Sequence, residues 1–93
     1  MTTTNIPVWM EIDGEHTAEA LRQAGENLDS ANGEVVLDFA SVRRLDPAAL
    51  KAMEELASSA HEKAVKVVLR GVNVNVYKVL KLARLSPRFA FMA

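Results

Sequence analysis

The chain has 93 residues, which is enough for one small domain with a single hydrophobic core. Hydrophobic residues make up 49% and charged residues 25%, a balance that excludes a disordered or low-complexity chain. Cysteine is absent, which excludes disulfides and thiolate metal sites and suits the cytoplasmic location that we expect. No apolar run approaches the roughly 20 residues of a membrane-spanning helix, so we expect no membrane insertion. Residues 1–5 are interpreted as a polar, disordered tail without the layout of a secretory signal.

The net charge of −1 conceals a strong polarity along the chain. Residues 1–33 carry a net charge of −5, residues 34–64 carry −2, and residues 65–93 carry +6 with no acid. This asymmetry has two interpretations. The basic end is a surface for an acidic partner, or the two ends fold together and partly neutralise each other. The sequence leaves both open.

The first third of the chain predicts a strand followed by a helix. Apolar and polar residues alternate between Ile6 and Ile12, which is the period of a strand, and an Asp-Gly turn signal follows. The helix is expected from about Thr17, as its N-cap, to about Asp29. Residues 30–33 are expected to form a loop.

The middle third predicts a buried strand and a long helix. Glu34–Phe39 is apolar on both faces apart from Asp38, which indicates a central strand covered on both sides. The helix is expected over Pro47–Glu62, because Asp46 can cap it and proline is tolerated at the first helical position. Five apolar residues at helical spacing are expected to face the core: Leu50, Met53, Leu56, Ala57 and Ala60.

The last third predicts a strand over Val65–Arg70, a helix ending near Leu85, and a final strand over Arg88–Met92. Either Asn73 or Asn75 can cap that helix, and a Ser-Pro pair stops it. The order β-α-β-α-β-α-β favours a single α/β domain over residues 1–93. We expect a mixed, mostly parallel sheet of four to five strands with helices packed on it.

The pattern gives little support to catalytic or metal sites. His16 and His61 lie far apart in the sequence and have no partner at chelating spacing, so no metal is expected. Ser41 lies in a strand-to-helix connection but lacks the glycine neighbours of a nucleophile turn. Pairs of acidic residues close together in the chain are explained by an exposed helix surface and by helix capping, so they do not indicate acid–base catalysis. No glycine-rich phosphate-binding loop precedes a helix. We therefore expect neither enzyme activity nor a cofactor.

Nucleic-acid binding is an alternative raised by the expected third helix. Lys78, Lys81 and Arg84 recur there at three-residue intervals, and a basic helix can lie along phosphates. The helix brings few aromatic or amide side chains that could read bases, which argues against this alternative.

The chain from residue 34 onward resembles a known family. EVVLDFASVRRLDPAAL is similar to the STAS signature: a Val/Leu strand ending in Asp, a small residue, a hydrophobic residue two positions later, and an aspartate that opens a helix. The segments VKVVLRGV and NVNVYKVLKLARLSPRFAFM resemble the next strand, last helix and last strand of that family. The likeness covers residues 34–92 well and residues 6–33 weakly.

The resemblance implies a non-catalytic docking module of the anti-sigma-factor-antagonist type, whose partner is a kinase-like anti-sigma factor. In that branch the kinase phosphorylates a serine or threonine directly after the helix-opening aspartate, and the added charge ends binding. Asp46 matches the motif, but the next residue is Pro47, so no phosphorylation is expected at the motif position. The resemblance also implies two alternatives: an accessory STAS subunit of a lipid-type transporter that binds its ATPase, or a homo-oligomeric sensory scaffold.

The surface residues point to the same region of the chain. The loop 41–45 carries two adjacent arginines, and the turn 71–75 is expected at the same sheet edge because both follow parallel strands. Open α/β sheets bind ligands at that edge. The alternative that the arginines only solvate their loop stays open. The predicted docking surface consists of Arg43, Arg44, Asp46, Pro47, Ala48, Lys51 and Asn73.

Overall fold

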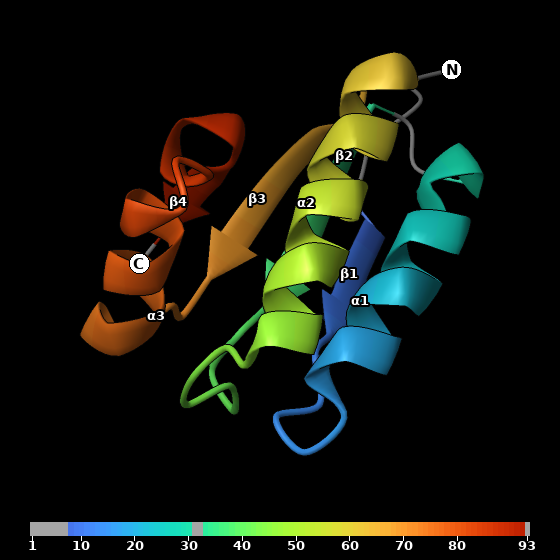
Figure 1. Cartoon of the computed structure of the whole chain (residues 1–93). Coiled ribbons are helices and arrows are strands. Elements are labelled where there is room, and N and C mark those ends of the chain that lie inside the picture. Colours follow the sequence, from blue (N-terminus) through green and yellow to red (C-terminus); the bar gives the residue numbers. More distant parts are fainter. Residues whose placement is uncertain (1–7, 31–32, 93) are drawn as a thin grey trace.

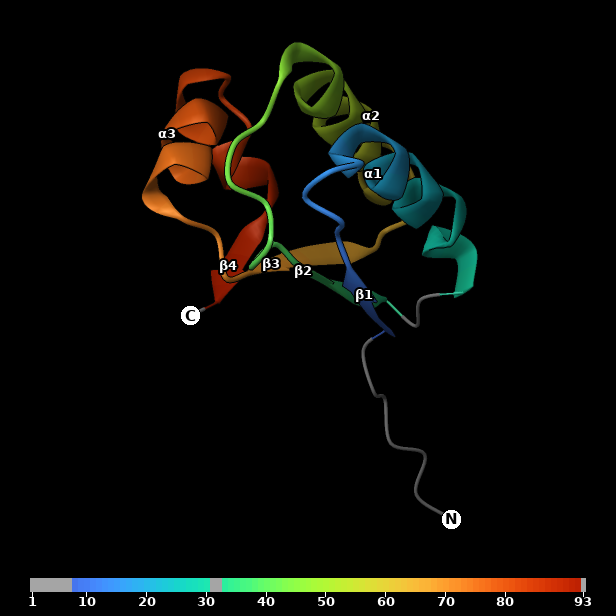
Figure 2. The same cartoon turned by 90° about the horizontal axis from the view of Figure 1, so that it is seen from below.

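The computed structural model describes residues 8–30 and 33–92, so the expected tail and Ile6 lie outside the described residues. The four strands form one parallel sheet in the order β1-β2-β3-β4, which confirms the α/β class. The three α-helices lie on one face of this sheet, with α2 between α1 and α3 (Figures 1 and 2). The elements are β1 (Val8–Glu11), α1 (Thr17–Glu26), η1 (Leu28–Ser30), β2 (Glu34–Asp38), α2 (Pro47–Glu62), β3 (Lys66–Arg70), α3 (Val74–Leu82), η2 (Ser86–Arg88) and β4 (Ala90–Met92).

The core lies between the sheet and the helices. Side chains alternate across each strand, so Val35 and Leu37 of β2 point into the core together with Val67 and Leu69 of β3. Each buried aliphatic side chain of this kind contributes roughly 1.5–3 kcal/mol relative to an exposed one. From α2 the core receives the expected Met53, Leu56, Ala57 and Ala60, with Leu50 at its margin, and also Ala49 and Ala52, which the sequence analysis missed.

No helix of the described residues lies on the other face of the sheet, so the expectation that β2 is covered on both sides is not met by the elements of segments 8–30 and 33–92 (Figure 2). Val36 and Val68 pair in register on this face and are nevertheless only 2% and 7% exposed. Two cross-strand pairs of oppositely charged residues lie on either side of these valines: Glu34–Lys66 and Asp38–Arg70. In the second pair, Arg70 Nη1 lies 3.4 Å from Asp38 Oδ2.

The first helix differs from its prediction at both ends. Thr17 is its first helical residue, not its N-cap: the Thr17 hydroxyl donates to the carbonyl oxygens of Asp13 (3.1 Å) and Gly14 (3.2 Å). The helix ends at Glu26, and a short 3-10 turn follows that keeps Leu28 buried.

The third helix ends at Leu82 rather than near Leu85 because a Schellman motif closes it. The N–H of Leu85 donates to the carbonyl of Leu80 at 2.8 Å, and the N–H of Arg84 donates to that of Lys81 at 3.1 Å. Arg84 adopts the left-handed conformation that this motif requires, with φ of 62°. The final strand accordingly begins at Ala90, two residues later than predicted.

A close backbone contact joins the turn after β1 to the loop after β2. A Cβ atom on Gly14 would lie 1.9 Å from the carbonyl oxygen of Ser41, so only glycine fits there. The Ser41 hydroxyl in turn donates to the carbonyl of Ile12 at 2.9 Å. The two connections are therefore held together by backbone shape and by one hydrogen bond.

We predict that Gly14→Ala lowers the free energy of unfolding by more than about 2 kcal/mol, because the obstructing atom belongs to the backbone and cannot rotate away. Gly25→Ala is the matched control: its Cβ would meet only Leu56 Cδ1 at 3.8 Å, so the better helix propensity of alanine should stabilise by up to about 1 kcal/mol. Urea denaturation measures both values. A Gly14→Ala protein as stable as the wild type would contradict the close contact.

Candidate docking surface

The candidate site lies where three parallel strands end. The N–H of Ile12, just after β1, donates to the carbonyl of Asp38 at 3.0 Å, and the N–H of Phe39, just after β2, donates to that of Arg70 at 2.7 Å. The strands therefore end level, and the connections that follow β1, β2 and β3 share one edge of the sheet. Open α/β sheets present ligand-binding surfaces at this edge.

The first turn of α2 projects from that edge. Asp46 caps the helix, since its Oδ1 accepts a hydrogen bond from the Ala49 N–H at 2.7 Å, and Pro47 occupies the first helical position. Asp46, Pro47 and Ala48 are exposed, whereas Ala49 is buried. The predicted helix start is confirmed, and three consecutive side chains at it face solvent.

Cations surround this helix start. Arg43, Arg44 and Lys51 are exposed, and none of them forms an ion pair with any residue of segments 8–30 and 33–92. The first turn of α2 contains no acid, and the helix dipole places partial positive charge at this end. Asp46 is the acid at this helix end, as its N-cap, and the two arginines lie in the loop that precedes it.

A hollow of about 450 Å³ opens beside the helix start, between the β1–α1 turn and the β2–α2 loop. Its charged side chains are Glu15, Arg44 and Asp46, so it can receive a polar side chain of a partner. Three of its lining residues, Gly14, Glu15 and Thr17, were not predicted, because they lie about 30 positions upstream and reach α2 only in the folded chain. The lining consists of Gly14, Glu15, Thr17, Arg44, Leu45, Asp46, Pro47 and Ala49.

An ion pair supports the turn that forms one wall of the hollow. His16 Nδ1 lies 3.1 Å from Asp13 Oδ2, and Asp13 Oδ1 accepts a hydrogen bond from the Glu15 N–H at 2.8 Å. The hydrogen bond from Glu15, followed by the contact with His16, lowers the pKa of Asp13. The hydrogen bond to Asp13 raises the pKa of His16. Protonated His16 would oppose the dipole at the start of α1, and Asp13 offsets that charge.

Asn73 lies at the same edge, but its polar atoms are engaged within the protein. Its Oδ1 accepts from the Val76 N–H at 2.8 Å, so Asn73 and not Asn75 caps α3. Its Nδ2 donates to the carbonyl oxygens of Val42 and Arg43, each at 3.1 Å. Asn73 therefore holds the β2–α2 loop against the start of α3, and its contribution to the site is to position Arg43.

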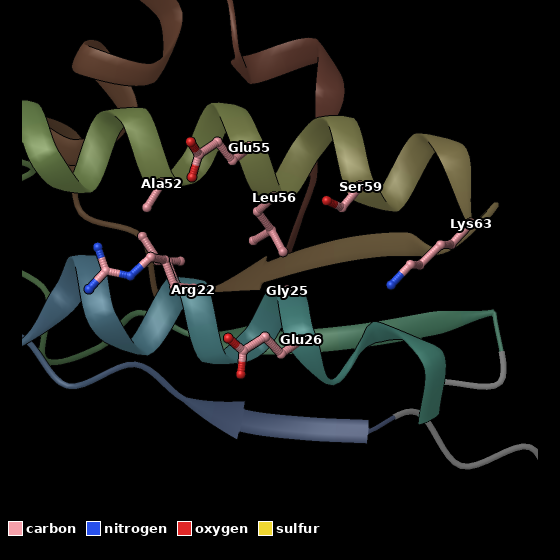
Figure 3. A pocket seen from close by; sticks show the side chains of 9 residues that line it. Arg22, Gly25, Glu26, Ala52, Glu55, Leu56, Ser59 and Lys63 are labelled. Atoms are coloured by element: carbon pink, nitrogen blue, oxygen red, sulfur yellow. The ribbon is translucent and has the colours of Figure 1, made fainter.

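A second hollow of about 350 Å³ lies between α1 and α2, where Ala52 and Leu56 point toward α1 (Figure 3). Its lining contains two bases, Arg22 and Lys63, and two acids, Glu26 and Glu55, so the hollow has no net formal charge to select a ligand. Lys63 extends from the end of α2 toward α1 and pairs with an aspartate of η1 at 3.1 Å. We interpret this hollow as the surface groove of a helix pair.

The described residues lack two features that other functions would require. No group of three or more histidine and carboxylate side chains comes together in them as a metal site would require. None of their helices has the length and apolar character to cross a membrane. His61 is exposed on α2.

We predict that Asn73→Ala lowers the free energy of unfolding by about 2–3 kcal/mol, through the lost cap and the lost loop bonds. Asn73→Ser keeps a capping oxygen but no bridge and should lose about half as much. Asn75→Ala is the control, since Asn75 is exposed within α3 and makes no side-chain hydrogen bond among the described residues. If Asn73→Ala and Asn75→Ala have equal stability in urea denaturation, the bridging role is wrong.

The fold of this chain is shared with several solved structures. A STAS domain of a SulP transporter from Vibrio cholerae superposes with a TM-score of 0.75 at 17% identity, covering 100% of this chain and 77% of the other. A candidate anti-sigma factor antagonist from Thermotoga maritima superposes in its crystal structure with a TM-score of 0.67 at 16% identity, covering 96% and 74%. The NMR structure of the same Thermotoga protein gives 0.72 at 17%, covering 90% and 71%.

No curated protein sequence matches the chain significantly. The family profile described as "Mlab, STAS domain" matches residues 4–87, which is nearly the whole chain. The chain therefore belongs to the STAS domain family.

Proposed function

We propose that this STAS domain is a non-catalytic docking module that binds an ATPase-fold protein through the first turn of α2 and the arginines before it. The observation that carries the proposal is the exposure of Asp46, Pro47 and Ala48 beside two cations without ion-pair partners in the described chain. Because STAS domains generally act by interaction, an enzymatic role is not required to explain these features. We expect the protein to act in the cytoplasm.

We further propose that docking is constitutive, because the family's usual phosphorylation switch has been removed. The position directly after Asp46 is exposed at the helix start, where a kinase would reach a hydroxyl. Pro47 offers none. A phosphate there would add nearly two negative charges beside the carboxylate of Asp46, and without it the surface keeps one charge state.

Two partner classes fit this surface. The first is a kinase-like anti-sigma factor, supported by the fold shared with the candidate antagonist from Thermotoga maritima. The second is the ATPase of a lipid-type ABC transporter, the alternative that the STAS resemblance implies; the fold shared with a SulP transporter domain supports only a link between such domains and transporters. Both partners are ATPase-fold proteins, so the same surface serves either proposal. A homo-oligomeric sensory scaffold is the remaining alternative.

We predict that the double charge reversal Arg43→Glu/Arg44→Glu weakens partner affinity at least tenfold while changing stability by less than about 0.5 kcal/mol, as expected for exposed side chains. The protein is purified from its own host, co-purifying proteins are identified by mass, and the affinity of the isolated partner is measured by calorimetry. The matched control is Lys78→Glu/Lys81→Glu on α3, which should bind normally. Unchanged affinity of the arginine variant, or recovery of only self-associated chains, would refute the proposal.

A second prediction separates the two partner classes. With the isolated partner and ATP, the wild-type chain and Pro47→Ala should stay unmodified, whereas Pro47→Ser should gain one phosphate if the partner is an anti-sigma kinase. Mass spectrometry of the intact protein measures the number of phosphates on each variant. An unmodified Pro47→Ser protein that still binds would assign the partner to the transporter class, and a phosphate on the wild-type chain would contradict constitutive docking.

A further inference from the structure

The charge polarity of the sequence becomes a spatial polarity in the fold. The acidic segment forms β1 and α1 at one end of the sheet, and the basic segment forms α3 and β4 at the opposite end (Figures 1 and 2). No ion pair joins residues 8–30 to residues 65–92. No direct ion pair therefore neutralises one end with the other in the described chain, and the bases Lys78, Lys81, Arg84 and Arg88 are exposed.

The outer face of α3 combines apolar and basic side chains. Val74, Lys78 and Leu82 follow one another at four-residue spacing along this face, and Val74 and Leu82 are 67% and 84% exposed. The opposite side of the helix packs into the core through Val76 and Leu80. The exposure of Val74 and Leu82 thus serves no contact within the described domain.

Strand β4 extends this apolar surface at the edge of the sheet. Phe91 and Met92 are 38% and 44% exposed, and the Phe91 ring meets that of Tyr77 edge-on with centroids 5.2 Å apart. A hollow of about 450 Å³ separates the start of α3 from β4, and most of its lining is apolar: Val72, Asn73, Val74, Tyr77, Phe91 and Met92. The basic face of α3 therefore lies next to this mostly apolar hollow.

We propose that the outer face of α3 and the edge of β4 form a peripheral binding surface for membranes that contain anionic lipids. Four exposed bases, Lys78, Lys81, Arg84 and Arg88, lie in α3, the turn that closes it and η2, and residues 65–93 contain no acid, which matches an anionic surface. The exposed apolar side chains enter the boundary between headgroups and acyl chains, and the lysine stems lie along them with the ammonium groups at the headgroups. The acidic end of the domain points away from such a membrane.

The position of Lys78 favours a lipid surface over a protein partner. Lys78 lies between Val74 and Leu82, at the centre of the exposed face, where the core of a protein–protein interface is depleted in lysine. Nucleic acid would satisfy the cations but would leave the apolar side chains Val74, Leu82 and Met92 against phosphates and water. An anionic membrane accommodates both kinds of side chain.

The test is co-sedimentation of the full chain with phosphatidylcholine vesicles, with and without about 30% phosphatidylglycerol. The wild type should bind only the anionic vesicles, and rising salt should weaken that binding. Lys78→Glu/Lys81→Glu should reduce binding at least about tenfold. Leu82→Ser should reduce it by a smaller factor without affecting the fold, because Leu82 is exposed.

Arg43→Glu/Arg44→Glu is the control and should bind vesicles like the wild type. The membrane-binding proposal and the proposal of docking at α2 are therefore tested independently of each other. Absence of binding to anionic vesicles would overturn the proposal. Equal binding of the wild type and Lys78→Glu/Lys81→Glu would also overturn it. Binding to duplex DNA without vesicle binding would assign the basic face to nucleic acid, and salt-sensitive self-association in its place would assign it to a second copy of the chain.

Discussion

The site depends on a single close contact between two connections of the sheet. Gly14 lies against the carbonyl of Ser41 at a distance that no side chain fits, and the Ser41 hydroxyl bonds back to Ile12. This contact fixes the turn before α1 against the loop before α2. The exposed start of α2, and the hollow beside it, exist because these two segments cannot separate or approach further.

Asn73 completes this support from the other side. Its amide nitrogen holds the carbonyls of Val42 and Arg43, while its oxygen caps α3. The β2–α2 loop is thus held at both of its flanks, although its own side chains Arg43 and Arg44 stay in solvent. A loop with a fixed backbone and free charged side chains is preorganised for binding, since little backbone entropy is lost when a partner docks.

The two proposed surfaces offer different kinds of side chain, and they meet only at Asn73, which positions the β2–α2 loop and also lines the hollow beside β4. The start of α2 presents charged side chains beside a hollow and has no hydroxyl that could be phosphorylated. Such a surface suits recognition of one protein. The α3–β4 end offers basic and apolar side chains in mixture, which suits a broad anionic surface. A domain with both could hold a partner at the start of α2 while its α3–β4 end faces a membrane, because side chains of both surfaces are exposed.

The order of the elements, the capping role of Asp46, the helix start at Pro47 and the charge polarity could all be read from the sequence, because these features depend on residues close together in the chain. Periodicity, capping and proline placement are local signals. The tertiary structure alone decided that Gly14 meets Ser41, that Asn73 supports a loop about 30 residues upstream, and that the charged ends lie apart. These features depend on how the parallel strands align. The strand register brings together residues that are far apart in the chain, and nothing in the sequence near either residue indicates which residue it will contact.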